Sequence, residues 1–261
     1  MSNIVTIGAM GLALASSIQG CINEITDQSA KPSKTYAVVV GMENSKYAGR
    51  CDGAGYDSER MYNLISNYTQ NIVKYRDDEA IKEVVVKALM NAIDKSGDEG
   101  LVIFSYSGHG GSDPFPDTGI EETDGKDEYL LLWDTYLRDN EIWNIISRSK
   151  SRIFLLFDCC HSQSMMKCPS FKITPPLGWD HTMNDKVKFS MLCWSGCPDD
   201  TYSYGSSSGG QFTNALLRHF NKDKTYETLW NEIKNDKTLR SYENPQSTVL
   251  GKGFEGVAVF R

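Results

Sequence analysis

Continuous apolar runs alternate along the chain with segments that have helically spaced apolar positions. The runs "LVIFSYS" (101–107) and "RIFLLFD" (152–158) have the length and composition of strands covered on both faces. β-branched residues dominate a third run at 34–42, and further strands are expected at 186–195 and 256–260. These runs predict the strands of a central sheet.

The segment 78–96 has the clearest helical pattern, because its apolar residues recur three, four, seven and eight positions apart. Helices are also predicted at 57–68, 211–220 and 226–235. Asp57 stands at the expected start of its helix and has the residue type of an N-cap. Since strands alternate with helices, the sequence predicts an α/β fold with a mostly parallel sheet and helices on both faces.

Two long segments carry no regular pattern: residues 108–128 are polar, and residues 163–185 are mixed in character. We interpret both as loops, and loops of this length in a compact domain are commonly functional or mobile. No internal repeat or linker interrupts residues 34–261, so we predict one domain there. Residues 1–33 are interpreted as an N-terminal extension and a candidate regulatory segment.

Composition narrows the class of protein. Of the 261 residues, 40% are hydrophobic and 11% aromatic, which suffices for a buried core. The net charge of −7 argues against nucleic acid as a partner. An apolar run of about a dozen residues near the N-terminus is too short to span a bilayer and has no basic residue before it, so we expect neither a membrane anchor nor export. Seven cysteines without a disulfide framework favour a reducing compartment, the cytoplasm.

Reactive side chains directly follow two of the predicted strands. His109 stands in "SYSGHGG", just past the strand at 101–107. Cys159 and Cys160 stand in "FDCCHSQS", just past the strand at 152–158. Because ligands of open α/β sheets bind at the carboxyl ends of strands, we expect the imidazole to lie near a thiol, and a thiol–imidazole pair can attack a carbonyl carbon. Strand alternation points the two sulfurs in opposite directions, but chemistry alone leaves the choice between them open.

Glycines around His109 expose backbone amides beside it. The N–H of Gly110 and that of the nucleophile are candidate donors of an oxyanion hole. Several alternatives stay open on these residues alone. In the first, the histidine stands in an ordinary glycine-rich turn. In the second, the adjacent cysteines form a redox or zinc site. In the third, the fold binds partners without turnover. The zinc alternative is the weakest, because the cysteine spacing at 159–168 fits no standard zinc motif.

"YSGHG" (106–110) and "DCCHS" (158–162) closely resemble the two signature blocks of the caspase-like clan, especially those of metacaspases and their bacterial relatives, the orthocaspases. The resemblance extends over roughly residues 34–260. It implies a caspase-like three-layer sandwich and a cysteine endopeptidase. In the register of the second block, Cys160 is the nucleophile and Cys159 occupies the variable position, while His109 is the general base and acid.

The same resemblance implies a specificity pocket. Asp57, Ser107 and Asp158 match the positions of the acidic S1 residues in that family. A buried pair of carboxylates suits a guanidinium or ammonium group. The expected substrate is therefore a protein or peptide with Arg or Lys at P1, not Asp.

Many metacaspases bind calcium through a cluster of aspartates, and this chain departs from that pattern. Asp124 and Asp139 stand near matching positions and are weak calcium candidates together with Asn140, but Lys167 replaces an expected aspartate. An ammonium group opposes a divalent cation that needs several oxygen ligands, so the sequence argues against calcium and predicts no required cofactor.

By analogy with bacterial relatives that act in immunity, we expect a small-molecule or protein activator. The chain has no obvious linker between a large and a small subunit, which favours a monomer.

Overall fold

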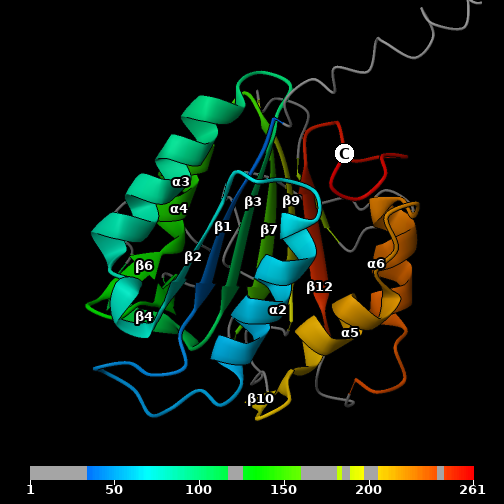
Figure 1. Ribbon diagram of the computed structural model, residues 1–261. Helices are drawn as coiled ribbons and strands as arrows, with labels where there is room; N and C mark the ends of the chain where they lie inside the picture. Colours follow the sequence, from blue (N-terminus) through cyan, green and yellow to red (C-terminus); the bar gives the residue numbers. More distant parts are fainter. Residues whose placement is uncertain (1–33, 117–125, 160–180, 184–188, 197–204, 240–243) are drawn as a thin grey trace, which may run out of the picture. The chain divides into compact units, whose positions relative to one another are not determined.

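A seven-stranded sheet forms the centre of the computed structural model, which describes residues 34–116, 126–159, 181–183, 189–196, 205–239 and 244–261 (Figure 1). The strand order is β2–β1–β3–β7–β9–β12–β8. The bounds are β1 Thr35–Gly41, β2 Ile72–Arg76, β3 Leu101–Ser107, β7 Arg152–Asp158, β8 His181–Met183, β9 Ser190–Ser195 and β12 Gln246–Leu250. Neighbours from β2 to β9 pair in parallel, whereas β12 pairs antiparallel with β9 and parallel with β8. The predicted mostly parallel sheet is thereby confirmed.

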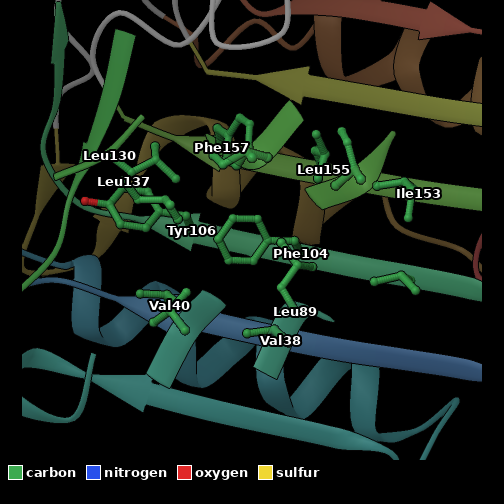
Figure 2. Close-up of a cluster of buried hydrophobic side chains, with 14 of the residues drawn as sticks. Val38, Val40, Leu89, Phe104, Tyr106, Leu130, Leu137, Ile153, Leu155 and Phe157 are labelled. Atoms are coloured by element: carbon green, nitrogen blue, oxygen red, sulfur yellow. The ribbon is translucent and has the colours of Figure 1, made fainter. Parts of the chain in front are cut away.

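Helices cover both faces of this sheet, as Figure 1 shows. The helices are α2 Ala54–Ser66, α3 Lys82–Ser96, α4 Asp139–Ile146, α5 Gln211–His219 and α6 Tyr226–Lys234. Alternate residues of each strand join opposite apolar clusters: Val38 and Val40 pack with α3 and α4, while Val39 packs with α2, α5 and α6. Figure 2 shows the first cluster, in which Phe104 lies between the strands and Leu89 of α3. The predicted three-layer α/β sandwich is confirmed.

A small antiparallel sheet follows the carboxyl end of β3. It consists of β4 Gly110–Pro116, β5 Lys126–Leu131 and β6 Tyr136–Arg138, in the order β4–β5–β6. The prediction that residues 108–128 form a loop is therefore wrong where β4 and β5 lie. The glycine, serine and proline composition of β4 carries no strand pattern, and pairing with β5 supplies its hydrogen-bonding partners.

Two other predicted elements also need correction. The helix expected at 78–96 begins at Lys82, because Ile81 is extended and the Lys82 N–H donates to the Asp134 carboxylate at 2.9 Å. The expected strand at 256–260 does not form. Phe260 has a φ of 65°, which strands exclude, and turns instead into the second apolar cluster.

None of the helices in the described part of the chain has the length and hydropathy of a membrane span. Residues 34–261 form one compact unit. Residues 1–33 lie outside the described residues, so their interpretation as a regulatory extension stays a prediction.

The Phe154 side chain is expected to be the most sensitive single position of the core. Its ring centroid lies 4.9 Å from that of Trp194 and 5.1 Å from that of Tyr226. Replacing Phe154 with alanine should lower the free energy of unfolding by about 4 kcal/mol, because it removes these contacts and leaves a cavity. Urea denaturation measures this loss. The control Met90→Ala removes a side chain of an exposed residue and should cost less than about 0.5 kcal/mol; equal losses would contradict the described packing.

Candidate active site

His109 follows β3 directly, and its ring is fixed by a backbone carbonyl. The Nε2 atom lies 2.8 Å from the carbonyl oxygen of Gly49. A carbonyl oxygen only accepts, so Nε2 must carry the proton of this hydrogen bond. In the neutral ring, Nδ1 is then the nitrogen that can take a proton from a thiol.

The backbone of His109 is tied to two strands. Its carbonyl oxygen accepts the Leu131 N–H at 3.0 Å, and it lies 2.7 Å from the hydroxyl of Tyr106. Gly108 allows this approach, because a Cβ there would stand 2.6 Å from the same hydroxyl and 2.8 Å from the Met42 Cβ. The imidazole therefore stands on a rigid support.

The loop that presents the Gly49 carbonyl is held by charged side chains. The Asp77 carboxylate accepts the N–H of Glu43 at 2.9 Å and that of Asn44 at 2.8 Å. Arg50 pairs with Glu43 across the same loop. These contacts restrict the positions that Gly49, and hence the ring of His109, can take.

Of the two adjacent cysteines, the described range 126–159 includes Cys159 and ends there. Cys159 follows β7 and is only 1% exposed, inside the apolar cluster that also holds Phe157 and Leu130. A thiol buried in this way cannot meet a substrate, which weighs against a redox or metal role for this sulfur. Cys160 lies outside the described residues, so its role as nucleophile and as an oxyanion-hole donor stays a prediction. Gly110 begins β4 opposite Leu130, and its role in the oxyanion hole is likewise untested.

The three predicted S1 residues meet at the carboxyl ends of the strands. Ser107 and Asp158 stand opposite each other in the β3–β7 pair. The Ser107 hydroxyl donates to Asp57 Oδ2 at 3.1 Å, and the Gly210 N–H donates to the same oxygen at 2.8 Å. Asp158 Oδ2 accepts the N–H and the hydroxyl of Thr213 at 2.9 and 2.7 Å, capping α5 where its N-cap Gly210 has no side chain.

Asp57 is not the N-cap of its helix. That position belongs to Gly53, whose φ of 91° and close contact with the Ser206 backbone require glycine. Asp57 instead lies one turn into α2 and is buried, with 1% exposure. Its backbone N–H donates to the Gly53 carbonyl at 2.9 Å. The prediction of an N-cap was wrong because the helix begins earlier, which turns the carboxylate toward the sheet.

Sequence reasoning missed Arg60, which pairs with Asp57. The Arg60 guanidinium donates to Asp57 Oδ1 and, at 2.6 Å, to the side-chain oxygen of Asn214. Its Cζ lies 4.4 Å from the ring centroid of Tyr56, at a cation–π distance. The signal that would have found it is the three-residue spacing of Asp57 and Arg60 on a predicted helix.

Two carboxylates and one guanidinium set the electrostatics of this cluster. Burial raises the pKa of Asp57 to about 7, and the nearby carboxylate of Asp158 adds to the rise, while the Gly210 N–H and Arg60 oppose it. With every group ionised, two carboxylates and one guanidinium leave a net charge of one negative unit. The pocket would therefore become neutral on taking up one positive group.

Two glycines of the short hairpin β10 Gly205–Ser206 and β11 Gly209–Gly210 pack against the carboxylates of Asp57 and Asp158. A Cβ at Gly209 would collide with Asp57 and Arg60, and a Cβ at Gly210 would collide with Asp158. The backbone of the hairpin thus lies directly against both carboxylates. Nothing in the sequence around these glycines indicated that role.

The weak calcium candidates are not brought into a metal site by the described residues. Asp139 is buried at the start of α4, and its Oδ1 accepts the N–H of Asn140 at 2.7 Å. Among the residues whose placement is described, no three His, Cys, Asp or Glu side chains are grouped as metal ligands. Asp124 and Lys167 lie outside those residues, so the argument against calcium stays a prediction.

Comparisons with known proteins identify the family of the chain. A family model described as "Caspase domain" matches residues 34–247. Metacaspase-1 of Candida glabrata is 24% identical over 231 residues, covering 80% of this chain and 57% of the relative. Metacaspase-1A of Aspergillus fumigatus is 22% identical over 288 residues, covering 88% and 64%. The chain thus spans less than two thirds of the length of either relative.

Solved structures share the fold. A Geobacter sulfurreducens protein superposes with a TM-score of 0.67 at 22% identity, covering 85% of this chain and 95% of that one. Caspase-1 from Spodoptera frugiperda superposes with a TM-score of 0.53 at 14% identity, covering 85% and 93%.

Proposed function

The chain belongs to the caspase domain family, and from this membership we propose that it is a cysteine endopeptidase that cleaves after Arg or Lys. The observation that carries the proposal is the meeting of Asp57, Ser107 and Asp158 beside the strand end that bears His109. A buried carboxylate pair next to a fixed imidazole has the two parts that such an enzyme needs, a cation-binding pocket and a proton carrier.

In the proposed mechanism, Nδ1 of His109 takes the proton of the Cys160 thiol, and the thiolate attacks the scissile carbonyl carbon. The N–H groups of Gly110 and Cys160 would stabilise the oxyanion of the tetrahedral intermediate. His109 then gives the proton to the leaving amine as the C–N bond breaks, which leaves a thioester on Cys160. A water molecule activated by His109 hydrolyses the thioester and restores the thiol.

The P1 side chain would bring one positive charge into the proposed pocket, whose ionised groups carry one net negative charge. An arginine or lysine side chain would pair with the carboxylates and neutralise the pocket, whereas an aspartate would be repelled by the net negative charge. The Ser107 hydroxyl and the Gly210 N–H hold one oxygen of Asp57 in place, which orients the carboxylate before substrate arrives.

Hydrolysis of a peptide panel with Arg, Lys or Asp at P1, measured with added calcium and with a chelator, tests this function. We expect cleavage after Arg and Lys that is equal in both conditions. Calcium dependence would contradict the proposal that a small molecule or a protein partner is the activator. Cleavage only after Asp would contradict the pocket. Silence in every condition would leave two explanations, a missing activator or a binding role without turnover. A stable dimer by mass measurement would contradict the proposed monomer.

The affinity of the pocket for a cation is expected to increase as the pH rises through about 7. Below that pH, Asp57 is protonated and neutral, because its pKa is raised to about 7, so a cation must displace the proton to bind. The dissociation constant of an arginine-ended product peptide, measured by calorimetry on Cys160→Ala between about pH 5.5 and 8, should fall by at most about tenfold per pH unit. Asp57→Asn should flatten this dependence. A flat profile in both proteins would contradict the assignment of Asp57.

A further inference from the structure

Three tyrosine rings form an exposed cluster beside His109. They are Tyr47, Tyr129 and Tyr136, here called the tyrosine cluster. The ring centroids of Tyr129 and Tyr136 are 4.4 Å apart, and those of Tyr47 and Tyr136 are 6.4 Å apart. Tyr47 is 60% exposed and Tyr136 is 37% exposed. Stacked rings that stay open to solvent give a surface on which another apolar group can pack.

The cluster is connected to His109 from two directions. Tyr136 stands opposite Leu131 in the β5–β6 pair, and the Leu131 N–H donates to the carbonyl of His109. Tyr47 precedes Gly49 by two residues in the loop whose carbonyl holds the imidazole. The rings and the imidazole therefore share the same supports.

Two of the rings, those of Tyr129 and Tyr136, lie on the outer face of the small sheet, and strand alternation from Gly111 places His109 toward the same face. Leu130 and Leu137 point into the apolar core (Figure 2), so strand alternation places Tyr129 and Tyr136 on the opposite, outer face. Gly111 pairs with Tyr129, and a Cβ on Gly111 would stand 2.6 Å from the Tyr129 hydroxyl. Because Gly111 lacks a side chain, the ring can lie over β4. His109 is two positions earlier, which in an extended chain is the same face.

The elements that carry the carboxylates and those that carry the rings lie at different places around the strand ends. In Figure 1, β4 and β6 lie to the left of the carboxyl ends of β1 and β3, while β10 and the start of α2 lie to the right. The histidine of a thiol peptidase gives its proton to the leaving amine, so the residues after the scissile bond lie on the histidine side. The P1 side chain lies on the acidic side, away from the rings.

We propose that the tyrosine cluster is a subsite for the substrate residues directly after the scissile bond and that it selects an aromatic or aliphatic side chain there. This inference rests on the proposed peptidase function. An apolar side chain that stacks on these rings would remove further ring surface from water, whereas an acidic side chain would gain no such contact.

The test compares two substrates that share Arg at P1. One is a quenched peptide with Gly in the two positions after the scissile bond, and the other is the same peptide with Phe or Leu in those positions. The readout is the ratio of kcat/KM for the Phe or Leu peptide to kcat/KM for the Gly peptide, which corrects for any general loss of active enzyme. Tyr136→Ala is expected to lower this ratio about tenfold, and Tyr47→Ala, which leaves the sheet untouched, severalfold.

Tyr62→Ala is the matched control, because Tyr62 lies on α2 under Lys74 and should leave the ratio unchanged. Wild-type enzyme should also prefer Phe or Leu over Gly or Asp after the scissile bond. Unchanged ratios in both cluster variants, with cleavage intact, would overturn the subsite alone. Failure of the wild type to cleave either substrate would overturn the proposed function, and the subsite with it.

Discussion

Replacement of Cys160 by alanine is expected to abolish peptide cleavage, whereas replacement of Cys159 by alanine is expected to preserve it. Loss of the nucleophile should lower kcat by roughly 10⁴-fold or more, since only binding and oxyanion stabilisation remain. Cys159 packs in the apolar core instead, so its loss should cost stability, about 1 kcal/mol, and little activity.

The measurement is kcat/KM on a peptide with Arg at P1, with thermal unfolding of each variant to confirm that it is folded. Each cysteine variant serves as the control for the other, because both replace a thiol by alanine and the two positions are adjacent. Activity lost only in Cys159→Ala would reverse the assignment. Activity retained in both variants would exclude thiol catalysis at this strand end.

Asp57→Asn and Asp158→Asn are each expected to lower kcat/KM for substrates with Arg at P1 by roughly 10²-fold to 10³-fold. The amide keeps the shape and the acceptor oxygen, so the loss reports the charge. Asp158→Asn retains an acceptor for Thr213 at the start of α5, which limits its effect on folding. For each variant, kcat/KM is measured on peptides with Arg, Lys, Gln or Asp at P1. A change in the ratios reports lost selectivity, whereas an equal decrease on all four peptides reports a loss of active enzyme.

Asp236→Asn is the matched control for this pair. Asp236 is also a buried carboxylate with basic partners, but it binds Arg218 and His219 at the end of α5, whereas Asp158 binds Thr213 at the start of that helix. Burial opposes its ionisation, yet hydrogen bonds from Thr238, His219 and Arg218 lower its pKa to about 2. Its stabilising effect is therefore present above about pH 4 and is lost as the pH falls toward 2. The control should lower stability near neutral pH and leave P1 selectivity intact; unchanged selectivity in the pocket variants would refute the acidic pocket.

The sequence predicted the buried strands best. The runs 101–107 and 152–158 form β3 and β7 with the same bounds. A short run that is apolar at every position must be covered on both faces, which a strand between two helical layers achieves. The small sheet after β3 was missed, since its glycines and polar residues gain their strand geometry from pairing. The run 256–260 misled because apolar residues can be buried from a turn as well as from a strand.

The site was predictable to a similar extent. The signature blocks made His109, Ser107 and Asp158 candidates, and the family resemblance added Asp57 as a candidate. The contacts that complete the pocket come from far along the chain: the Gly210 N–H bond to Asp57 joins residues 153 positions apart. No local pattern encodes such a contact, and only the fold brings the two groups together.

Arg60 gives the pocket a resident counterion. Without a counterion, two carboxylates held together in a buried site would repel each other or stay protonated. That repulsion would lower the stability of the fold when no substrate is bound. The guanidinium of Arg60, anchored by Asn214 and Tyr56, belongs to the chain and stays when a product leaves. Above about pH 7, where Asp57 is ionised, the site therefore holds one net negative charge without drawing an ion from the solvent. The incoming side chain then meets a site that differs from neutrality by one charge, so a singly charged cation completes it and a second cation would be in excess.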